Sequence, residues 1–529
     1  MIPEVEDKLT DKRIRYILFA GFILFFIFTR LFRLDVVPFG PHGMHVDELG
    51  SAYDAVCIKN WGVDQTLVKY PPYFKGLAGT GQNALYTYLA VIVFKILGVS
   101  LFNFRLVAVI CATAAFLCMY VLSYRVFKEW TYVFVSLALM TIMPVFMMSE
   151  HWGLESYLFL TMSIISMAFF MTAIQEGNTA CFILSGIFWG ITLYTYAISW
   201  IVVPMFLVLA LIYLIYTKAV NLKQTLALAI PMIIVGTPIF LQFLVITEII
   251  EPFSLPFMDF FTMSEFRSHS ISFAYIMENL KHTTYVLFVA DDQIYNSNSR
   301  FGLIYYVSIP FLLIGFIQAI VYSVRSIRKG ELNPWVLILL FYIVSRLVSL
   351  ITHAPNTNRM AHIYLPFLLF TALGIRWVIG KIKFKKTAAL IIAAAFGVSF
   401  LFFAKYFYSW SGYGQDTRGS MMCAPSEMGE TLAEIERQYG ADHKITAIAN
   451  DGYANPLMCA LFTETSPYDF KEDKINGCFY GVPNKLDLSG GTVYFIDNDL
   501  HHITDYLVTE GFSADRDRCE GFAIVTKVE

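Results

Sequence analysis

The sequence predicts a polytopic α-helical membrane protein that carries a small α/β domain at its C-terminal end. Apolar runs of 18 or more residues recur from residue 16 to residue 404, and a run of that length can cross a bilayer as a helix. Hydrophobic residues make up 57% of the chain, and its mean hydropathy is +0.59. Soluble globular chains of this length do not have such a composition.

The charge of the chain changes sign near residue 404. Residues 405–529 hold 10 Lys and Arg against 20 Asp and Glu, whereas residues 1–404 hold 28 against 21. We therefore expect a membrane domain over 1–404 and an extracytoplasmic domain over 405–529. The acidic tail has no basic cluster, which argues against binding of nucleic acid. Within the tail, a helix is expected at 426–438 and short strands at 445–449, 492–496 and 522–525.

The first span, 16–33, sets the expected orientation. Basic residues precede it, and positive charge stays on the cytoplasmic side, so we expect the N-terminus inside the cell. No small-residue cleavage site follows, so we interpret the span as a retained helix. Arg30 and Arg33, at its outer end, can reach the outer headgroups. About eleven spans are predicted: 16–33, 102–124, 131–149, 157–174, 179–197, 199–217, 225–247, 302–323, 334–351, 361–380 and 387–404.

Residues 84–98 are predicted to lie flat on the outer membrane face rather than to cross it. The run is short and contains Lys95, and a crossing needs about 20 apolar residues. This assignment also keeps Arg125 and Lys128, which follow the next span, on the cytoplasmic side. Almost every inner loop is then basic. The exception is the loop at 175–178, which has no basic residue.

An unusually charged stretch follows the first span directly. It places His42, His45, Asp47 and Glu48 within seven residues. Charge this dense at a membrane face is costly in contact with lipid, so it usually faces a water-filled cavity or a binding site. The alternative is a solvated loop whose charges have no function.

Further polar residues reach the same outer face from four other parts of the chain. Carboxylates there could act as a general base, and Lys or Arg could neutralise a phosphate. Carboxylates and cations gathered on one face of a membrane protein together suggest a reaction on a charged lipid headgroup. The residues are Glu155 and His151 between the third and fourth spans, Lys69 and Tyr73 before residue 84, Arg105 at the start of the second span, and Arg359 between the ninth and tenth spans.

In order and spacing, these motifs resemble the GT-C fold glycosyltransferases of the protein O-mannosyltransferase and aminoarabinose transferase superfamily, which is glycosyltransferase family 39-like. The resemblance covers about residues 14–404. The tail does not match the extra domain of the protein mannosyltransferases, so a protein acceptor is not implied. The matching motifs are Val46-Asp47-Glu48, Pro71-Pro72, 98–106, Pro144 with 150–155, 194–200 and 356–359.

The resemblance implies transfer of a sugar, with inversion, from a polyprenyl-phosphate donor to an acceptor hydroxyl on the outer face. Asp47 matches the acid proposed as general base, with Glu48 beside it, and Glu155 matches a second acid. This chain departs from relatives that have Ser-Arg where it has Glu150-His151. The implied phosphate-binding residues are Lys69 (or Lys75), Arg105 and Arg359, and His45, His151 and Tyr73 are the further candidate substrate contacts.

We expect no metal or other cofactor to be required, because the leaving group is already a phosphate, although adjacent acids could hold a divalent cation. The expected partners are the polyprenyl-phosphate sugar, membrane lipid, and an acceptor that is a glycan, a lipid or a protein. The rival class is a transporter or flippase of a lipid-linked sugar. A transporter would place ionisable residues deep within its spans and repeat broken helices in two halves, whereas here the charges gather at the outer ends and no internal repeat is seen.

Overall fold

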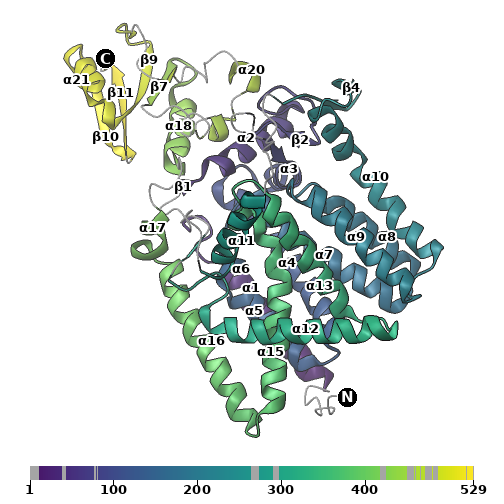
Figure 1. Ribbon diagram of the computed structural model, residues 1–529. Helices are drawn as coiled ribbons and strands as arrows, with labels where there is room; N and C mark the ends of the chain where they lie inside the picture. The colour runs from purple at the N-terminus through teal and green to yellow at the C-terminus, as the bar shows by residue number, and fades with distance from the viewer. Residues whose placement is uncertain are drawn as a thin grey trace.

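Helices dominate the chain up to Phe407 in the computed structural model (Figure 1). A separate five-stranded sheet follows near the C-terminal end. The structure describes residues 11–37, 43–76, 79, 81–263, 273–289, 297–298, 300–417, 424–449, 458, 460–464, 466–470, 479–480, 486–519 and 521–527.

Nine helical segments in this described part are long and apolar enough to cross a membrane. Two of them, Tyr306–Lys329 and Thr357–Lys381, join shorter helical pieces into one continuous segment. The prediction of a polytopic helical protein is therefore confirmed. The helices are α1 Lys12–Leu31, α2 Val46–Trp61, α3 Leu85–Leu97, α4 Leu101–Phe127, α5 Trp130–Ile142, α6 Pro144–Ser149, α7 Glu155–Glu176, α8 Thr179–Thr192, α9 Ser199–Tyr216, α10 Leu222–Ile246, α11 Phe273–Phe288, α12 Ile309–Lys329, α13 Pro334–Ile351, α14 Thr357–Met360, α15 Tyr364–Lys381 and α16 Lys385–Phe407.

Two predicted spans correspond to shorter helices. The span predicted at 131–149 divides into α5 and α6 at Pro144, because proline has no amide hydrogen and its ring clashes with the preceding turn. The span predicted at 179–197 ends early, at Thr192. Helices α5 and α8 have 13 and 14 residues, so each is about 20 Å long, against a hydrocarbon core of about 30 Å.

Close backbone contact joins α12 to α15. An added Cβ atom on Gly315 would lie 1.7 Å from the carbonyl oxygen of Phe370, and one on Gly374 would lie 1.8 Å from that of Phe311. A side chain at either glycine would therefore separate the two helices. Membrane helices without a strong hydrophobic driving force commonly use small residues in this way.

The acidic loop at 175–178 lies beside the basic residues at the end of α4. Arg125 pairs with Glu176, Lys128 donates to Gln175, and the Gln175 amide donates to the Arg125 carbonyl oxygen at 2.8 Å. The two loops therefore lie at the same end of the helices. The positive charge that the 175–178 loop lacks is supplied by its neighbour.

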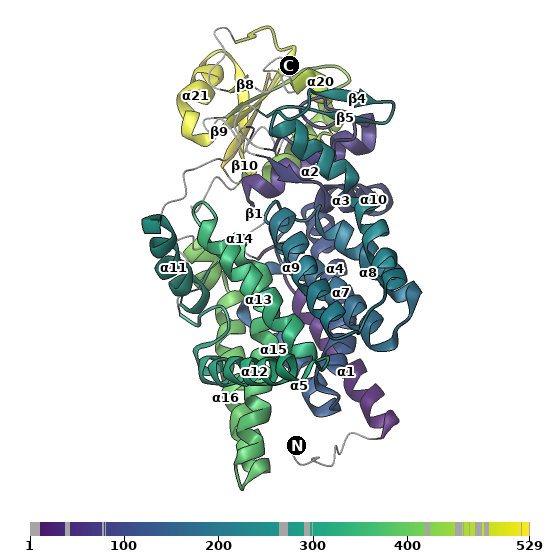
Figure 2. The ribbon, with the colours of Figure 1, turned by 45° about the vertical axis from the view of Figure 1, so that its right-hand side comes forward.

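We expect this end to be cytoplasmic and the C-terminal sheet to be outside. The start of α1 and the C-terminal sheet lie at opposite ends of the molecule (Figures 1 and 2). A single cysteine introduced as Lys128→Cys should react with a membrane-impermeant maleimide only after permeabilisation, whereas Asp505→Cys in the tail should react in intact cells. Labelling of the 128 position from outside would contradict this topology.

Helices α2 and α3 lie at the end of the bundle that carries the tail (Figure 2). Helix α3 has 13 residues, too few for a crossing, and exposes Ile92, Ile96 and Leu97. The hairpin of β4 Phe253–Leu255 and β5 Met258–Phe260 lies beside the segment around Lys69, since the Asp259 amide donates to the Lys69 carbonyl oxygen. Short strand pairs also join β2 Tyr73–Phe74 to β3 Gln82–Asn83 and β1 Gly43–Met44 to β6 Ala424–Pro425.

The C-terminal sheet has the strand order β10-β11-β9-β7-β8. Strand β7 runs parallel to β8 and β9, and β11 runs antiparallel to β9 and β10. The helix and all three strands predicted in the tail are present. Strand β10 and helix α21 were not predicted. The elements are α18 Ser426–Tyr439, β7 Lys444–Ala449, α20 Pro467–Phe470, β8 Phe479–Tyr480, β9 Thr492–Asp497, α21 His501–Thr509, β10 Phe512–Cys519 and β11 Phe522–Lys527.

Candidate active site

A cavity of about 640 Å³ opens between the start of α9, the last turns of α10 and the end of α13. Its walls are mostly apolar and aromatic, and its polar side chains come from the segments at 83, 155, 353 and 359. Small-molecule sites commonly have this composition, with mostly apolar walls and a few polar groups that fix the orientation of the ligand. The lining residues are Tyr73, Gly81, Asn83, Glu155, Leu193, Tyr196, Ala197, Ile198, Trp200, Ile201, Pro204, Gly236, Ile239, Phe240, Phe243, Met263, Val348, Ile351, Thr352, His353 and Arg359.

Glu155 is the carboxylate on the cavity wall. It is the first residue of α7, where the helix dipole stabilises a negative charge. The Gln82 amide nitrogen lies 3.3 Å from the Glu155 Oε2 atom, 3.3 Å from the Asp47 carbonyl oxygen and 2.5 Å from the Ser51 hydroxyl. Gln82 therefore joins the first turn of α2 to the polar end of the cavity. It links the Glu155 carboxylate to the backbone of Asp47, which lies more than 100 positions earlier in the sequence, whereas the Asp47 side chain is not among the residues that line the cavity.

Arg359 is the cation on the same wall. Asn356 caps its short helix by accepting a hydrogen bond from the Arg359 amide at 3.0 Å. The guanidinium Nη1 donates to the carbonyl oxygens of His353 and Ala354. Its Nε and Nη2 atoms make no hydrogen bond with the described part of the chain. Two donors of a planar fork thus stay available beside the cavity, which is the arrangement that suits a phosphate.

Tyr73 shapes the cavity through its ring. The ring is nearly buried and meets the indole of Trp200 edge-on, with 5.2 Å between the centroids. The Trp200 indole nitrogen donates to the Leu193 carbonyl oxygen at 2.8 Å, and the Asn83 amide donates to the same oxygen at 3.3 Å. These bonds fix the irregular segment between α8 and α9 against the segment that contains Asn83. The two aromatic rings can therefore form a rigid platform beside Glu155.

Glu48 and Arg105 form a buried ion pair away from the cavity. Both side chains have 0% exposure, and the guanidinium holds the two carboxylate oxygens at 2.9 and 2.8 Å. The other Arg105 hydrogens go to the carbonyl oxygens of Leu34, Val37 and Gly43, so all five N–H groups are used. Burial alone would raise the pKa of Glu48, but Arg105 and two backbone amides hold this pKa below its usual value. The pair is therefore charged and structural in this arrangement, with no donor of Arg105 left for a phosphate.

The Glu48 carboxylate also fixes the loop that leads to Glu155. The Gly153 amide donates to Glu48 Oε1 at 2.8 Å. A Cβ atom at Gly153 would lie 2.3 Å from the Phe104 ring. The backbone at Gly153 therefore packs directly against Phe104 and Glu48. The position of the first turn of α7 thus depends on the Glu48–Arg105 pair.

His45 caps α2 and does not neutralise Asp47. Its Nδ1 atom accepts a hydrogen bond from the Asp47 amide at 3.2 Å, and the Asp47 carboxylate lies 3.7 Å from the same nitrogen. Burial lowers the pKa of His45 more than the nearby Asp47 and Glu48 charges raise it. A neutral imidazole does not compensate the negative charge of Asp47. The Asp47 side chain is 52% exposed. His42 lies outside the described residues.

A second buried ion pair corrects the expectation for Arg30. Its side chain has 0% exposure and its Nε atom lies 2.6 Å from Glu150 Oε2, so it does not reach the headgroups. The guanidinium also donates to the carbonyl oxygens of Met140 and Thr141, near the end of α5. A buried charge must be paired and hydrogen-bonded, and Glu150 supplies the pairing here.

His151 and Lys69 lie apart from the cavity. The buried His151 ring packs edge-on against Phe407, with 5.0 Å between centroids, and its Nδ1 atom bonds the Met147 carbonyl oxygen. The Lys69 ammonium bonds the Pro256 carbonyl oxygen at 2.6 Å and so holds the β4–β5 hairpin. Neither residue lines the cavity that holds Glu155 and Arg359.

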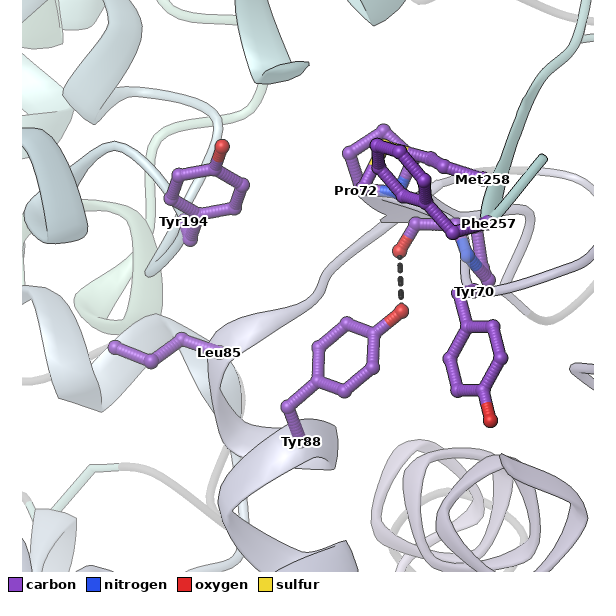
Figure 3. Close-up of a pocket in the computed structure, with 8 residues that line it drawn as sticks. Tyr70, Pro72, Leu85, Tyr88, Tyr194, Phe257 and Met258 are labelled. Carbon is purple, nitrogen blue, oxygen red and sulfur yellow. Dashed lines mark hydrogen bonds between the residues drawn. The ribbon is translucent and has the colours of Figure 1, made fainter. Parts of the chain in front are cut away.

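A smaller, almost entirely apolar cavity lies beside the Lys69 segment (Figure 3). In the close-up, the rings of Tyr88 and Tyr194 stand across from Pro72 and Phe257. The Tyr88 hydroxyl donates to the Pro71 carbonyl oxygen at 2.9 Å, and the Tyr194 hydroxyl donates to that of Val235 at 2.8 Å. Both hydroxyls are thus directed to the backbone, and the rings present apolar faces.

Sequence reasoning missed several residues of the larger cavity. Asn83 and His353 line it, and Gln82 bonds Glu155 on its wall. Gln82 and Asn83 lie just before α3, and His353 precedes Arg359 by six positions. Polar residues in outer loops are common, so no local signal distinguished these three from others. The spacing of the acids gave no information on which amide would bond Glu155. Among the described residues, no group of three His, Cys, Asp or Glu side chains could hold a metal ion.

The helical bundle with its outer-face helices and small C-terminal sheet defines a membrane protein of the GT-C fold. No protein-family model matches the sequence, and no curated protein matches it. The solved structures supply the comparison. The aminoarabinose transferase ArnT from Cupriavidus metallidurans bound to undecaprenyl phosphate matches with a TM-score of 0.54 and 14% identity over 98% of this chain and 99% of ArnT.

Two further solved structures agree with this fold. ArnT from the same organism in the apo state also has a TM-score of 0.54, with 11% identity over 97% of this chain and 98% of ArnT. The Archaeoglobus fulgidus oligosaccharyltransferase tethered to an acceptor peptide has a TM-score of 0.50, with 11% identity over 98% of this chain and 74% of its own length. The fold expected from the motif resemblance is confirmed.

Proposed function

We propose that this chain is an inverting membrane glycosyltransferase that moves a sugar from a polyprenyl-phosphate donor to an acceptor hydroxyl on the extracytoplasmic face. The observation that carries this proposal is the apolar cavity with Glu155 and Arg359 on its wall. Its apolar length suits the polyprenyl chain, and the polar residues suit a sugar phosphate. The fold match to an ArnT structure that holds undecaprenyl phosphate supports the same class of donor.

In the proposed reaction, the acceptor oxygen bonds to the anomeric carbon as the bond from that carbon to the phosphate oxygen breaks. Polyprenyl phosphate leaves, and its charge is held by the Nε and Nη2 donors of Arg359. Such a transition state resembles an oxocarbenium ion. Glu155, at the cavity wall, is placed to stabilise that positive charge or to hold a sugar hydroxyl.

Asp47 remains our proposed general base. Its carboxylate is half exposed, and neutral His45 does not neutralise it, so it can take the acceptor proton from the outer side. Gln82 fixes the backbone of Asp47 relative to Glu155. For Glu48 and Arg105, the buried pair leads us to propose a structural role in place of the catalytic and phosphate-binding roles expected from the sequence. Lys69 we propose as an anchor of the hairpin.

Arg359 offers a direct test of phosphate binding. Arg359→Ala should raise the donor KM by about tenfold, because hydrogen bonds to charged groups contribute roughly 1.5–3 kcal/mol each and solvent access weakens them here. Arg359→Lys should retain part of the affinity, since it keeps the charge and loses the planar fork. Lys69→Ala is the matched control and should leave the donor KM unchanged. Equal KM values for wild type and Arg359→Ala would remove this residue from the donor site.

A reconstituted assay separates this function from the rival class of transporter or flippase. Purified protein in liposomes would be given a panel of isotope-labelled polyprenyl-phosphate sugars together with membrane extract as a source of acceptor. A transferase releases polyprenyl phosphate and places the label on a new product. A flippase changes the leaflet of the intact donor and forms neither. The proposal would be overturned if the donors moved between leaflets and none of the donors in the panel was cleaved.

A further inference from the structure

The C-terminal domain contacts the helix that carries Asp47 at that helix's beginning. Strand β1 ends one residue before His45, the N-cap of α2. It pairs antiparallel with β6 of the tail, with Gly43 opposite Pro425 and Met44 opposite Ala424. The backbone that enters the first turn of α2 is therefore part of a two-stranded sheet whose other strand belongs to the tail.

The tail also holds the last turn of α2. The Lys59 ammonium lies 3.0 and 2.9 Å from the two carboxylate oxygens of Glu464, and the Asn60 amide donates to one of them at 2.7 Å. The Lys59 side chain is only 15% exposed, and that of Glu464 is 38% exposed. One tail carboxylate thus accepts hydrogen bonds from two consecutive residues of α2.

An apolar cluster continues from α2 into the tail between these two contacts. The tail lies against α2 at the outer end of the bundle in both views (Figures 1 and 2). The cluster includes Leu49, Tyr53 and Val56 of α2, Met428, Leu432 and Ile435 of α18, and Met458 and Leu461 nearby.

The membrane part supplies the opposing contacts. The Gly43 carbonyl oxygen accepts a hydrogen bond from Arg105 at 2.9 Å, so β1 lies between Arg105 and the tail strand. Ser51 of α2 bonds Gln82, which also reaches Glu155. The position of α2 relative to the cavity is therefore set from two sides, by the bundle and by the tail.

We propose that the C-terminal domain positions Asp47 for catalysis by holding α2 at both ends, with Lys59 and Glu464 as positioning residues. This inference rests on the proposed function of Asp47. It assigns the tail a role in the chemical step, although no tail residue lines the cavity among those described. Donor binding should then be independent of the tail contact, and turnover should depend on it.

The test uses the full-length protein and a reversal of charge. Glu464→Lys places two ammonium groups together at the end of α2, and we expect kcat to fall about three- to tenfold while the donor KM stays unchanged. The double variant Lys59→Glu/Glu464→Lys should restore most of kcat. Asp505→Lys is the matched control: it makes the same charge change in the tail, where Asp505 pairs with Arg516 and not with α2, and it should keep wild-type kcat.

Hydrogen exchange of the amides of residues 46–50 gives a second measurement that does not need activity. Exchange there should be faster in Glu464→Lys than in wild type and Asp505→Lys, and slow again in the double variant. Wild-type kcat in Glu464→Lys, or a loss that the double variant does not restore, would overturn the inference. If the wild-type protein transfers no sugar from any donor, the proposed function fails by itself, and unchanged exchange in Glu464→Lys would then overturn the tail contact separately.

Discussion

Asp47→Asn should lower the rate of sugar transfer by roughly 10²–10⁴-fold, the usual cost of removing a general base. The amide keeps the size of the side chain and cannot take a proton. Asp47 is half exposed and is not part of the buried Glu48–Arg105 pair, so the variant should fold and bind donor as the wild type does. Single-turnover kinetics with preloaded donor would measure the chemical step, and equilibrium binding would measure donor affinity.

Glu155→Gln distinguishes the two acids. If Glu155 stabilises charge on the sugar without taking the proton, Glu155→Gln should slow sugar transfer. The pH dependence of the transfer rate, which Asp47 sets, should then stay unchanged. Normal turnover in Asp47→Asn together with the full loss in Glu155→Gln would move the base to Glu155. Misfolding of Asp47→Asn would instead make that acid structural.

Glu48→Gln should destabilise the protein by roughly 3–5 kcal/mol, because it leaves the Arg105 guanidinium buried without a counter-charge. The Glu48 carboxylate accepts hydrogen bonds from Arg105 and from the Gly153 amide. The neutral side-chain amide of the variant would accept fewer and weaker ones. Thermal unfolding in detergent, compared at equal protein and lipid concentration, would show a large drop in the midpoint. The surviving folded fraction should bind donor with wild-type affinity.

The exposed pair of Arg516 and Asp505 supplies the control for this prediction. Their side chains are 47% and 59% exposed, and exposed pairs contribute about 0–1 kcal/mol. Asp505→Asn should therefore change the midpoint little. An equally small effect of Glu48→Gln would contradict a structural role for the buried pair and return Glu48 to the list of catalytic candidates.

Most of the spans and three of the tail strands could be predicted because each depends on a local apolar pattern. Strands β7, β9 and β11 are apolar runs in an otherwise polar tail, and the structure has each of them. Strand β10 was missed because its sequence, Phe-Ser-Ala-Asp-Arg-Asp-Arg-Cys, is highly charged. It is an edge strand, and edge strands commonly carry charge that prevents pairing with other chains.

The ion pairs of the site could not be predicted, because they join residues far apart in the sequence. Arg105 and Glu48 are 57 positions apart, and Arg30 and Glu150 are 120 apart. The positive-inside rule concerns residues that stay in water, so it gave no reason to bury Arg30. Charge alone likewise did not separate Arg359, which lies at the cavity, from Lys69, which bonds the hairpin. Only packing distinguishes a cation that binds ligand from one that binds protein.

A comparison of extracytoplasmic glycans by mass spectrometry tests the account most directly. Cells that produce the wild-type protein would be compared with cells that produce Asp47→Asn at the same level in the membrane. We predict that one class of glycoconjugate loses a single sugar residue in the variant and that the intact polyprenyl-phosphate sugar accumulates. Identical glycans and identical donor levels in the two cell lines would contradict sugar transfer by this protein.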